Sequence, residues 1–290
     1  VIAVLYLKPL TITLYCSKII SLFRNGISLI FVTIFKSIIM ALFQSGNPTL
    51  SQKFFSREAS AGYADAMTVR GALNKFGFLL FMVIGGAAYT WHLFYSGAPQ
   101  SMQTWMYVGL FGGLVAAIAI SIKPMWAPYI APAYGILEGL FLGAISAILN
   151  EAFAQKYPGL IMQATGLTFG VAIAMFLLYN FRIIKATEKL KSIILTATAG
   201  IFIFYLITMV LRLFHVNLPF MSLTDASPLG IGISLFVIAI AALNLILDFD
   251  MIEQGANNGA PKYMEWYGAF GLLVTMVWLY IEILKLLSRF

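Results

Sequence analysis

The sequence predicts an all-α membrane protein, folded as a bundle of seven transmembrane helices. Of its 290 residues, 61% are hydrophobic and only 10% are charged, whereas a soluble domain carries about 25% charged residues. Seven apolar windows also reach the length of about 20 residues that a helix needs to cross a bilayer. The connections between them are too short to hold a further domain. We therefore expect lipid to be the main solvent and any activity to belong to the bundle itself.

The windows follow one another along the chain, and each ends where polar or turn-forming residues begin. The intervening connections read GAPQSMQT, KPMWAP, EAFAQKYPG, RIIKATEKLK, HVNLPFMSLTDAS and DMIEQGANNGAPKYME. Aromatic residues fall near the window ends, as in the aromatic belts of membrane proteins; they are Trp91, Trp105, Trp126, Trp266 and Tyr267. The predicted spans are 76–95, 105–122, 126–149, 160–181, 192–214, 228–247 and 266–284.

The distribution of Lys and Arg predicts how the bundle is oriented, because these residues gather on the cytoplasmic side. One side holds Lys53, Arg57, Arg70, Lys75, Lys123, Arg182, Lys185, Lys189, Lys191 and Lys262. The other side holds Lys156, Arg212, Lys285 and Arg289. We expect the first side to be cytoplasmic, which places the segment before the first span inside and the C-terminus outside.

Residues 1–39 do not match the rest of the chain. Their longest uncharged run, from Asn25 to Phe35, is too short to span a bilayer comfortably. We expect Met40 to be the native start; the alternative is an extra interfacial or signal-like helix. A true eighth span would move the N-terminus to the outside. The predicted division is a non-native or accessory extension at 1–39, a polar cytoplasmic segment at 40–75 and the seven-helix domain at 76–290.

Several classes of function are disfavoured by what the sequence lacks. The net charge of +7 fits basic cytoplasmic loops, and no basic run alternates with aromatic residues as nucleic-acid binding would require. The single cysteine, Cys16, excludes an internal disulfide, and His92 and His215 lack metal-ligand spacing. No HExxH, CxxC or GxGD signature is present, and no GxSxG stands beside a usable histidine. We therefore expect no enzyme, no resident metal, no cofactor and no nucleic-acid partner.

Ionisable residues inside a membrane are costly, so each is a candidate for function. The stretch LNLILDFDMIEQG ends the span 228–247 with two aspartates, which lie about 200° apart around a helix. Asn244 and Asp248 are four residues apart and share a face. We expect Asp248 to point inward with Asn244 as support, and Asp250 to be a solvated residue at the helix end. The alternative is that a loop lysine such as Lys262 simply holds Asp248.

The third span carries Glu138 within YGILEGLFLGAIS. Gly135, Gly139 and Gly143 repeat at four-residue spacing beside it, a pattern that lets another helix approach closely. Glu138 should therefore face protein or water. It is either a residue of a pore or proton path, or a protonated glutamate in a hydrogen bond between helices.

The last span contains the polar residues Thr275, Glu282 and Lys285, and Glu265 stands at its start. Glu282 and Lys285 are three residues apart, so we expect them to pair near the outer interface. Glu265 belongs to the predicted cytoplasmic end, where it is a further candidate acid.

Four segments together resemble the Bax inhibitor family (transmembrane Bax inhibitor motif proteins), in its bacterial YccA-like branch. They read MALFQSGNPTLSQKFF, APAYGILEGLFLGAIS, LILDFDMIEQG and MEWYGAFGLLVTMVWLYIEILKLL, and the resemblance covers about residues 40–290. It implies a multi-pass protein of the bacterial inner membrane, with the last helix central and ringed by the other six. It also implies a pH-sensitive calcium leak gated by acids near the cytoplasmic mouth, with Ca²⁺ as permeant ion. Roles in stress tolerance and in modulating a membrane protease are implied as well.

The resemblance also assigns residues. The family carries an Asp four residues before an Ile in the sixth helix, which Asp248 and Ile252 match. The family's second gating acid falls here between Thr275 and Trp278, where no residue is acidic. Asp248 would then need Glu265 or Glu138 as a substitute to form a proton-sharing pair.

Two further aspects of function stay open from the sequence. A cation that holds the gate closed could come from Lys123 or Arg182, both on the predicted cytoplasmic side. The main alternative to a leak is a non-conducting regulator that binds another membrane protein, such as a membrane-bound protease. A proton-coupled transporter is a third hypothesis.

Overall fold

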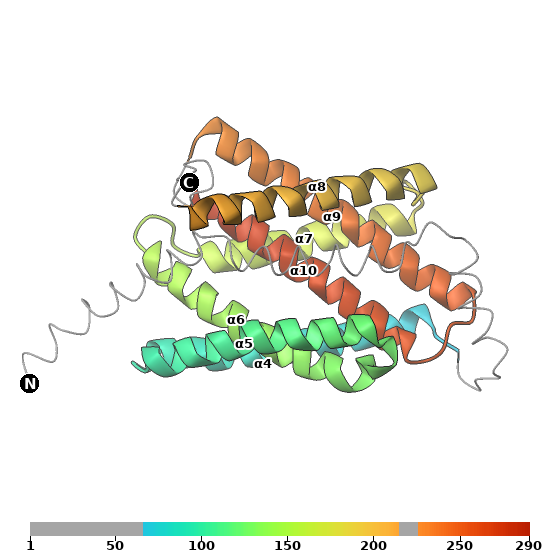
Figure 1. The fold of residues 1–290 in the computed structure, drawn as a ribbon, viewed down its shortest axis with the longest axis horizontal. Coiled ribbons are helices and arrows are strands. Elements are labelled where there is room, and N and C mark those ends of the chain that lie inside the picture. The colour runs from blue at the N-terminus through green and yellow to red at the C-terminus, as the bar shows by residue number, and fades with distance from the viewer. Residues whose placement is uncertain (1–65, 215–225) are drawn as a thin grey trace, which may run out of the picture.

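The structure is a computed structural model, and the residues that it describes are 66–214 and 226–290. The predictions for residues 1–39 and 40–65, and for His215, lie outside these ranges. Within them the chain forms seven long helices and no strand (Figure 1). The seven helices are all long and apolar enough to cross a membrane, which confirms the all-α seven-helix bundle.

Each predicted span corresponds to one helix. The helices are α4 (Val69–Tyr95), α5 (Pro99–Ile122), α6 (Ala127–Ala152), α7 (Leu160–Asn180), α8 (Glu188–Leu213), α9 (Pro228–Asn257) and α10 (Met264–Ser288). A single 3-10 turn, η1 (Pro124–Trp126), precedes α6. Local sequence fixes several starts: the hydroxyls of Thr68 and Ser227 cap α4 and α9 by accepting hydrogen bonds from backbone N–H groups.

Several helices extend beyond their apolar windows, and the largest difference matters for the candidate site. α4 begins at Val69 rather than at residue 76. α9 continues to Asn257 rather than ending near residue 247, so Asp248 and Asp250 lie inside the helix and not at its end. The apolar window ends where polar residues begin. The helix itself continues until just before Gly259, which has a left-handed backbone with a φ of 66°, as is common after the end of a helix.

The end of the bundle that holds Lys75, Lys123, Arg182, Lys191 and Lys262 is called the basic end below; it lies at the right of Figure 1. The start of α4, the turn between α7 and α8, and the turn between α9 and α10 all lie at that end. The backbone N–H of Met67 also donates to the carbonyl of Ala260 at 2.7 Å. This contact ties the segment before α4 to the α9–α10 turn.

α6 and α10 are the most buried of the seven helices. α10 runs between the group α4–α5–α6 and the group α7–α8–α9, and packs against α4, α6, α7 and α9 (Figure 1). The central position implied for the last helix is therefore confirmed. α5 packs mainly on α4 and α6, so it covers α6 and does not complete a ring of six around α10.

The glycine stripe of α6 forms a close contact with another helix, as predicted, and the structure shows that this helix is α4. A Cβ atom on Gly139 would lie 2.2 Å from the carbonyl oxygen of Val83, and one on Gly86 would lie 2.4 Å from that of Ile136. Two helix backbones can approach this closely only without side chains between them. The contact fixes how α6 presents Glu138.

The aromatic residues near the helix ends divide into two kinds. Trp105 and Trp126 are 40% and 46% exposed, as expected of an aromatic belt. Tyr267 is only 1% exposed and belongs to the core, contrary to its predicted place in that belt. It stands near the start of α10, and the central position of that helix buries it.

Candidate functional site

Asp248 points into the bundle and meets the central helix. It is 5% exposed, and Thr275 on α10 is fully buried. The Thr275 hydroxyl donates a hydrogen bond to the Asp248 carboxylate, and it also lies 3.2 Å from the carbonyl oxygen of Gly271. The structure thus brings together two residues that the sequence had proposed separately.

Two neighbours of this pair have different roles. The side-chain amide of Asn244 donates to the Thr198 hydroxyl at 2.9 Å and to the carbonyl of Ile240 at 2.8 Å. Asn244 therefore links α9 to α8, while Asp248, one turn later, links α9 to α10. Tyr267 lies within electrostatic range of Asp248, a proximity that the sequence did not indicate.

Glu265 forms a separate, fully buried site where α4 and α10 begin. Its carboxylate accepts hydrogen bonds from the backbone N–H and the hydroxyl of Thr68, both at 2.9 Å. It also pairs with Lys75, and with Lys262 at 3.2 Å. A carboxylate at helix N-termini is favoured by the helix dipole. The structure thus places Glu265 among cations and N–H groups, and Lys262, proposed as a partner of Asp248, binds Glu265.

A third cluster joins α7, α8 and α9 at the basic end. Asp250 pairs with Lys191 at 2.9 Å, and its side chain is 15% exposed, so it is not the solvated end residue that we expected. Glu253 pairs with Arg182 and accepts a hydrogen bond from Tyr179. Both acids occupy a helix that continues to Asn257, where α7 and α8 can still reach them.

Arg182 lies in the turn after α7 and contacts Glu253 on α9. It is the one non-glycine residue in the described ranges with a left-handed backbone, at φ 57°, a conformation that is uncommon for such residues. The hydrogen bond to Glu253 raises the pKa of the Arg182 guanidinium above its ordinary value. Lys123, the other proposed cation, lies 4.7 Å from the ring centre of Trp126.

Glu138 is buried in the middle of α6, at 7% exposure. It faces α5: a Cβ atom on Gly113 would lie 3.4 Å from its Oε2. Within the described residues, its Oε1 is buried without a hydrogen-bond partner. The structure therefore places Glu138 at the α5–α6 contact, away from the α9–α10 contact that holds Asp248.

Near the opposite end of the bundle, Glu282 and Lys285 pair at 2.7 Å, which confirms the predicted interaction. Their side chains are 0% and 11% exposed, so the pair is buried within the bundle. Tyr205 on α8 completes it: its hydroxyl donates to Glu282 at 3.1 Å and accepts from Lys285 at 3.0 Å. The cluster connects α8 to α10.

The residues that sequence reasoning missed share one property. Lys75, Tyr179, Lys191 and Tyr205 are the partners of the singled-out acids. A tyrosine inside an apolar span was a usable signal, because a buried hydroxyl needs a hydrogen-bond partner. The lysines carried no such signal, because they also fit solvated ends of helices.

Comparison with known proteins identifies the family. A sequence model of the family described as Bax inhibitor 1 like matches residues 47–290, which is most of the chain. No curated protein and no solved structure matches it. The matched region contains all seven spanning helices, together with Asp248, Glu265 and their partners. The chain is therefore a multi-pass membrane protein of the Bax inhibitor 1 like family.

Proposed function

We propose that this protein is a pH-sensitive cation leak, with Ca²⁺ as permeant ion and Asp248 as the gating acid. The observation that carries the proposal is the burial of Asp248 against the central helix, where Thr275 binds its carboxylate. A buried acid inside a bilayer is costly and is a mark of ion and proton pathways. We also propose that the protein belongs to the YccA-like branch of the family, lies in the bacterial inner membrane and has no catalytic role.

The chemistry of Asp248 suits a gate. An ionised carboxylate only accepts hydrogen bonds, whereas the protonated acid also donates one. Calcium binds carboxylate and carbonyl oxygens, and an inward acid on neutral walls attracts cations. Protonation of Asp248 therefore changes both its contact with Thr275 and its attraction for a cation.

The four remaining acids of α9 and α10 have structural roles. Asp250, Glu253, Glu265 and Glu282 each form an ion pair with a Lys or Arg. These pairs hold α4, α7, α8, α9 and α10 together and neutralise the charges involved. We assign them to the closed structure of the bundle, with the Arg182–Glu253 pair at the basic end.

Flux in proteoliposomes tests the proposal. Calcium flux through the purified protein should exceed that of protein-free vesicles and change with pH across neutrality. Asp248→Asn should remove that pH dependence, because the amide does not titrate. Glu151→Gln, at an exposed acid of the opposite end, is the matched control and should behave as the wild type. Equal flux in the wild type and Asp248→Asn at every pH would reject Asp248 as the gate.

One observation favours a second candidate, a non-conducting regulator that binds another membrane protein. The resemblance implies a second gating acid between Thr275 and Trp278, where no residue is acidic, and Asp248 contacts the Thr275 hydroxyl instead. A membrane-bound protease is the partner that the resemblance implies. Co-purification of such a protein in mild detergent, with no flux above protein-free vesicles, would support the regulator and contradict the leak.

A further inference from the structure

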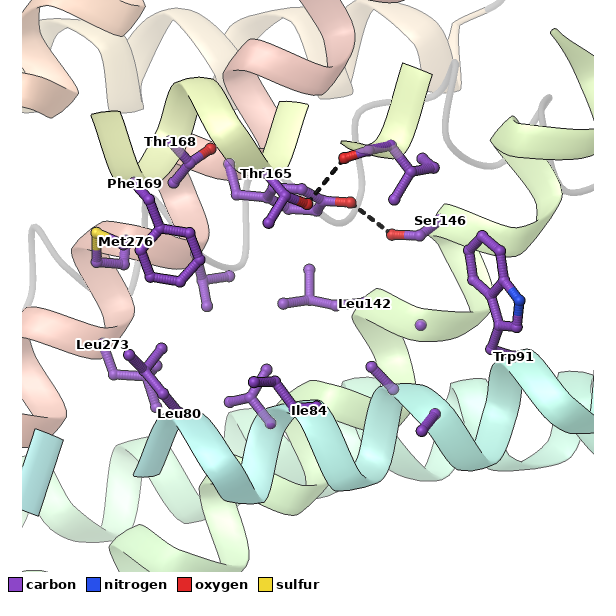
Figure 2. A pocket seen from close by; sticks show the side chains of 17 residues that line it. Leu80, Ile84, Trp91, Leu142, Ser146, Thr165, Thr168, Phe169, Leu273 and Met276 are labelled. Atoms are coloured by element: carbon purple, nitrogen blue, oxygen red, sulfur yellow. Dashed lines mark hydrogen bonds between the residues drawn. The ribbon is translucent and has the colours of Figure 1, made fainter. Parts of the chain in front are cut away.

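A cavity of about 460 Å³ lies between α4, α6, α7 and α10 (Figure 2). It does not include Asp248 or any residue of the ion-paired clusters. Its walls are mainly aliphatic and aromatic, and its polar atoms are a few hydroxyls. The lining residues include Leu80, Ala88, Trp91, Ser146, Thr165 and Tyr280.

The cavity opens toward the bilayer. Ile84 on α4 and Phe169 on α7 both line it, and they are 58% and 38% exposed. Both belong to helices that are long and apolar enough to cross a membrane, so this exposed rim faces lipid tails. The inner wall is formed by the buried helices α6 and α10, with Leu142 and Val277.

The length of the cavity matches one leaflet of a bilayer. Along α4 it runs from Leu80 to Trp91, which is about 16 Å at a rise of about 1.5 Å per residue. Half of a hydrocarbon core of about 30 Å is about 15 Å. The cavity lies in the half of the bilayer away from the basic end, because Leu80 is near the middle of α4 and Trp91 is near its C-terminal end.

The hydroxyls gather toward that same end. Ser146, Thr165 and Tyr280 each lie about two turns from the end of their helix that is opposite the basic end. The Ser146 and Tyr280 hydroxyl oxygens are 2.7 Å apart (Figure 2). Thr165 is a further hydrogen-bond neighbour of the Tyr280 hydroxyl, so the three hydroxyls form one polar group that can donate a hydrogen to a ligand carbonyl. The Thr165 hydroxyl donates to the carbonyl of Ile161 at 2.8 Å and keeps its lone pairs.

We propose that this cavity binds one acyl chain of a phospholipid from the leaflet opposite the basic end. The chain would lie along α4, and its ester carbonyl would accept a hydrogen bond from the Ser146–Tyr280 pair. The volume suits this ligand: at roughly 30 Å³ for each water-sized group, 460 Å³ holds about fifteen such groups, and a methylene is of similar size. An apolar cavity does not hold ordered water, but it does bind apolar ligands. This site is independent of ion conduction.

Native mass spectrometry of the full chain, purified in mild detergent and washed to remove loose lipid, tests the site. The wild type should retain one phospholipid per protein. Ala88→Phe places a ring on the exposed part of the cavity wall and should reduce the retained fraction about tenfold, which corresponds to a loss of roughly 1.4 kcal/mol only in the limit where little lipid is bound. Ala174→Phe, an exposed position on α7 that does not line the cavity, is the matched control and should retain the lipid.

A second filling variant and a spectroscopic measurement guard against a folding defect in Ala88→Phe. Thr165→Phe fills the cavity from α7 and should also lose the lipid. In vesicles, phospholipids brominated on the acyl chain should quench wild-type fluorescence, and Trp91→Phe should lose the quenched component. Wild type without bound phospholipid, equal retention in the two filling variants and the control, or a bound free fatty acid in place of a phospholipid would each overturn the proposal.

Discussion

The hydroxyl of Thr275 on α10 donates a hydrogen bond to the carboxylate of Asp248 on α9. Both side chains are buried, and α10 is the central helix of the bundle. The resemblance to the family implies a second acid near residue 275, yet here the contact joins an acid to an alcohol. Two carboxylates share a proton because like charges resist joint ionisation, and an alcohol cannot take part in such sharing. This contact therefore differs from a pair of carboxylates that share a proton.

Removing the hydroxyl tests what the contact contributes to stability. Thr275→Val keeps the shape of the side chain but deprives a buried carboxyl oxygen of its donor. We expect a loss of about 1–2 kcal/mol in the free energy of unfolding, more than the average of about 0.6 kcal/mol for hydrogen bonds between membrane helices. Thermal unfolding in one detergent gives the comparison. Thr275→Ser retains the donor and should lie closer to the wild type; equal losses in the two variants would contradict the assignment.

Introducing the missing acid tests the gating proposal from the other direction. Thr275→Asp would place two carboxylates in contact, so the pair should share one proton and titrate in two separated steps. We expect calcium flux in proteoliposomes to gain a new pH-dependent step near neutrality. Asp248→Asn in the same protein should abolish that step, because only one acid then remains. An identical pH profile in Thr275→Asp and the wild type would show that the contact does not control the ion path.

The sequence was sufficient for the number and order of the spanning helices in residues 66–214 and 226–290, since an apolar run of about 20 residues is the length that a helix needs to cross a bilayer. It was insufficient for the end of α9. Hydropathy reports contact with lipid, and it falls at Asp248, whereas backbone hydrogen bonding continues to Asn257. Candidate acids were recognised by the same signal, because a charge inside an apolar run stands out.

The partners of those acids could not be read in the same way. Glu265 binds Lys75, which lies 190 positions earlier in the chain. Helical periodicity tells which residues share a face, but it does not tell which helix that face meets. The glycine stripe of α6 is the informative exception, because small residues at four-residue spacing specify a close helix neighbour. Even so, that α4 is this neighbour emerged only from the structure.

Because α4 and α6 are in close contact, alanine substitutions at two of their glycines should have different effects on stability. Gly139→Ala would put a Cβ atom 2.2 Å from the Val83 carbonyl oxygen, so the two helices must separate. We expect a loss of about 1–3 kcal/mol in the free energy of unfolding, as for other overpacked sites. Gly85→Ala, where nothing lies within 4 Å of the added atom, should be neutral or stabilising by up to about 1 kcal/mol, since Ala favours helix. Thermal unfolding that ranks the two variants in the reverse order would refute the packing argument.

Removing the charge of Glu265 should lower the free energy of unfolding more than removing the charge of an exposed acid does. The Glu265 carboxylate is fully buried and binds Lys75, Lys262 and Thr68, so Glu265→Gln removes the charge that both lysines face. We expect a loss of about 3 kcal/mol, the lower end of the range for breaking a buried pair, because the Lys75 and Lys262 side chains are 20% and 48% exposed. Glu188→Gln is the matched control: its side chain is 91% exposed in its pair with Lys191, and the change should stay within about 1 kcal/mol. Thermal unfolding of both variants in the same detergent gives the comparison, and equal losses would mean that Glu265 does not anchor the start of α10 to α4.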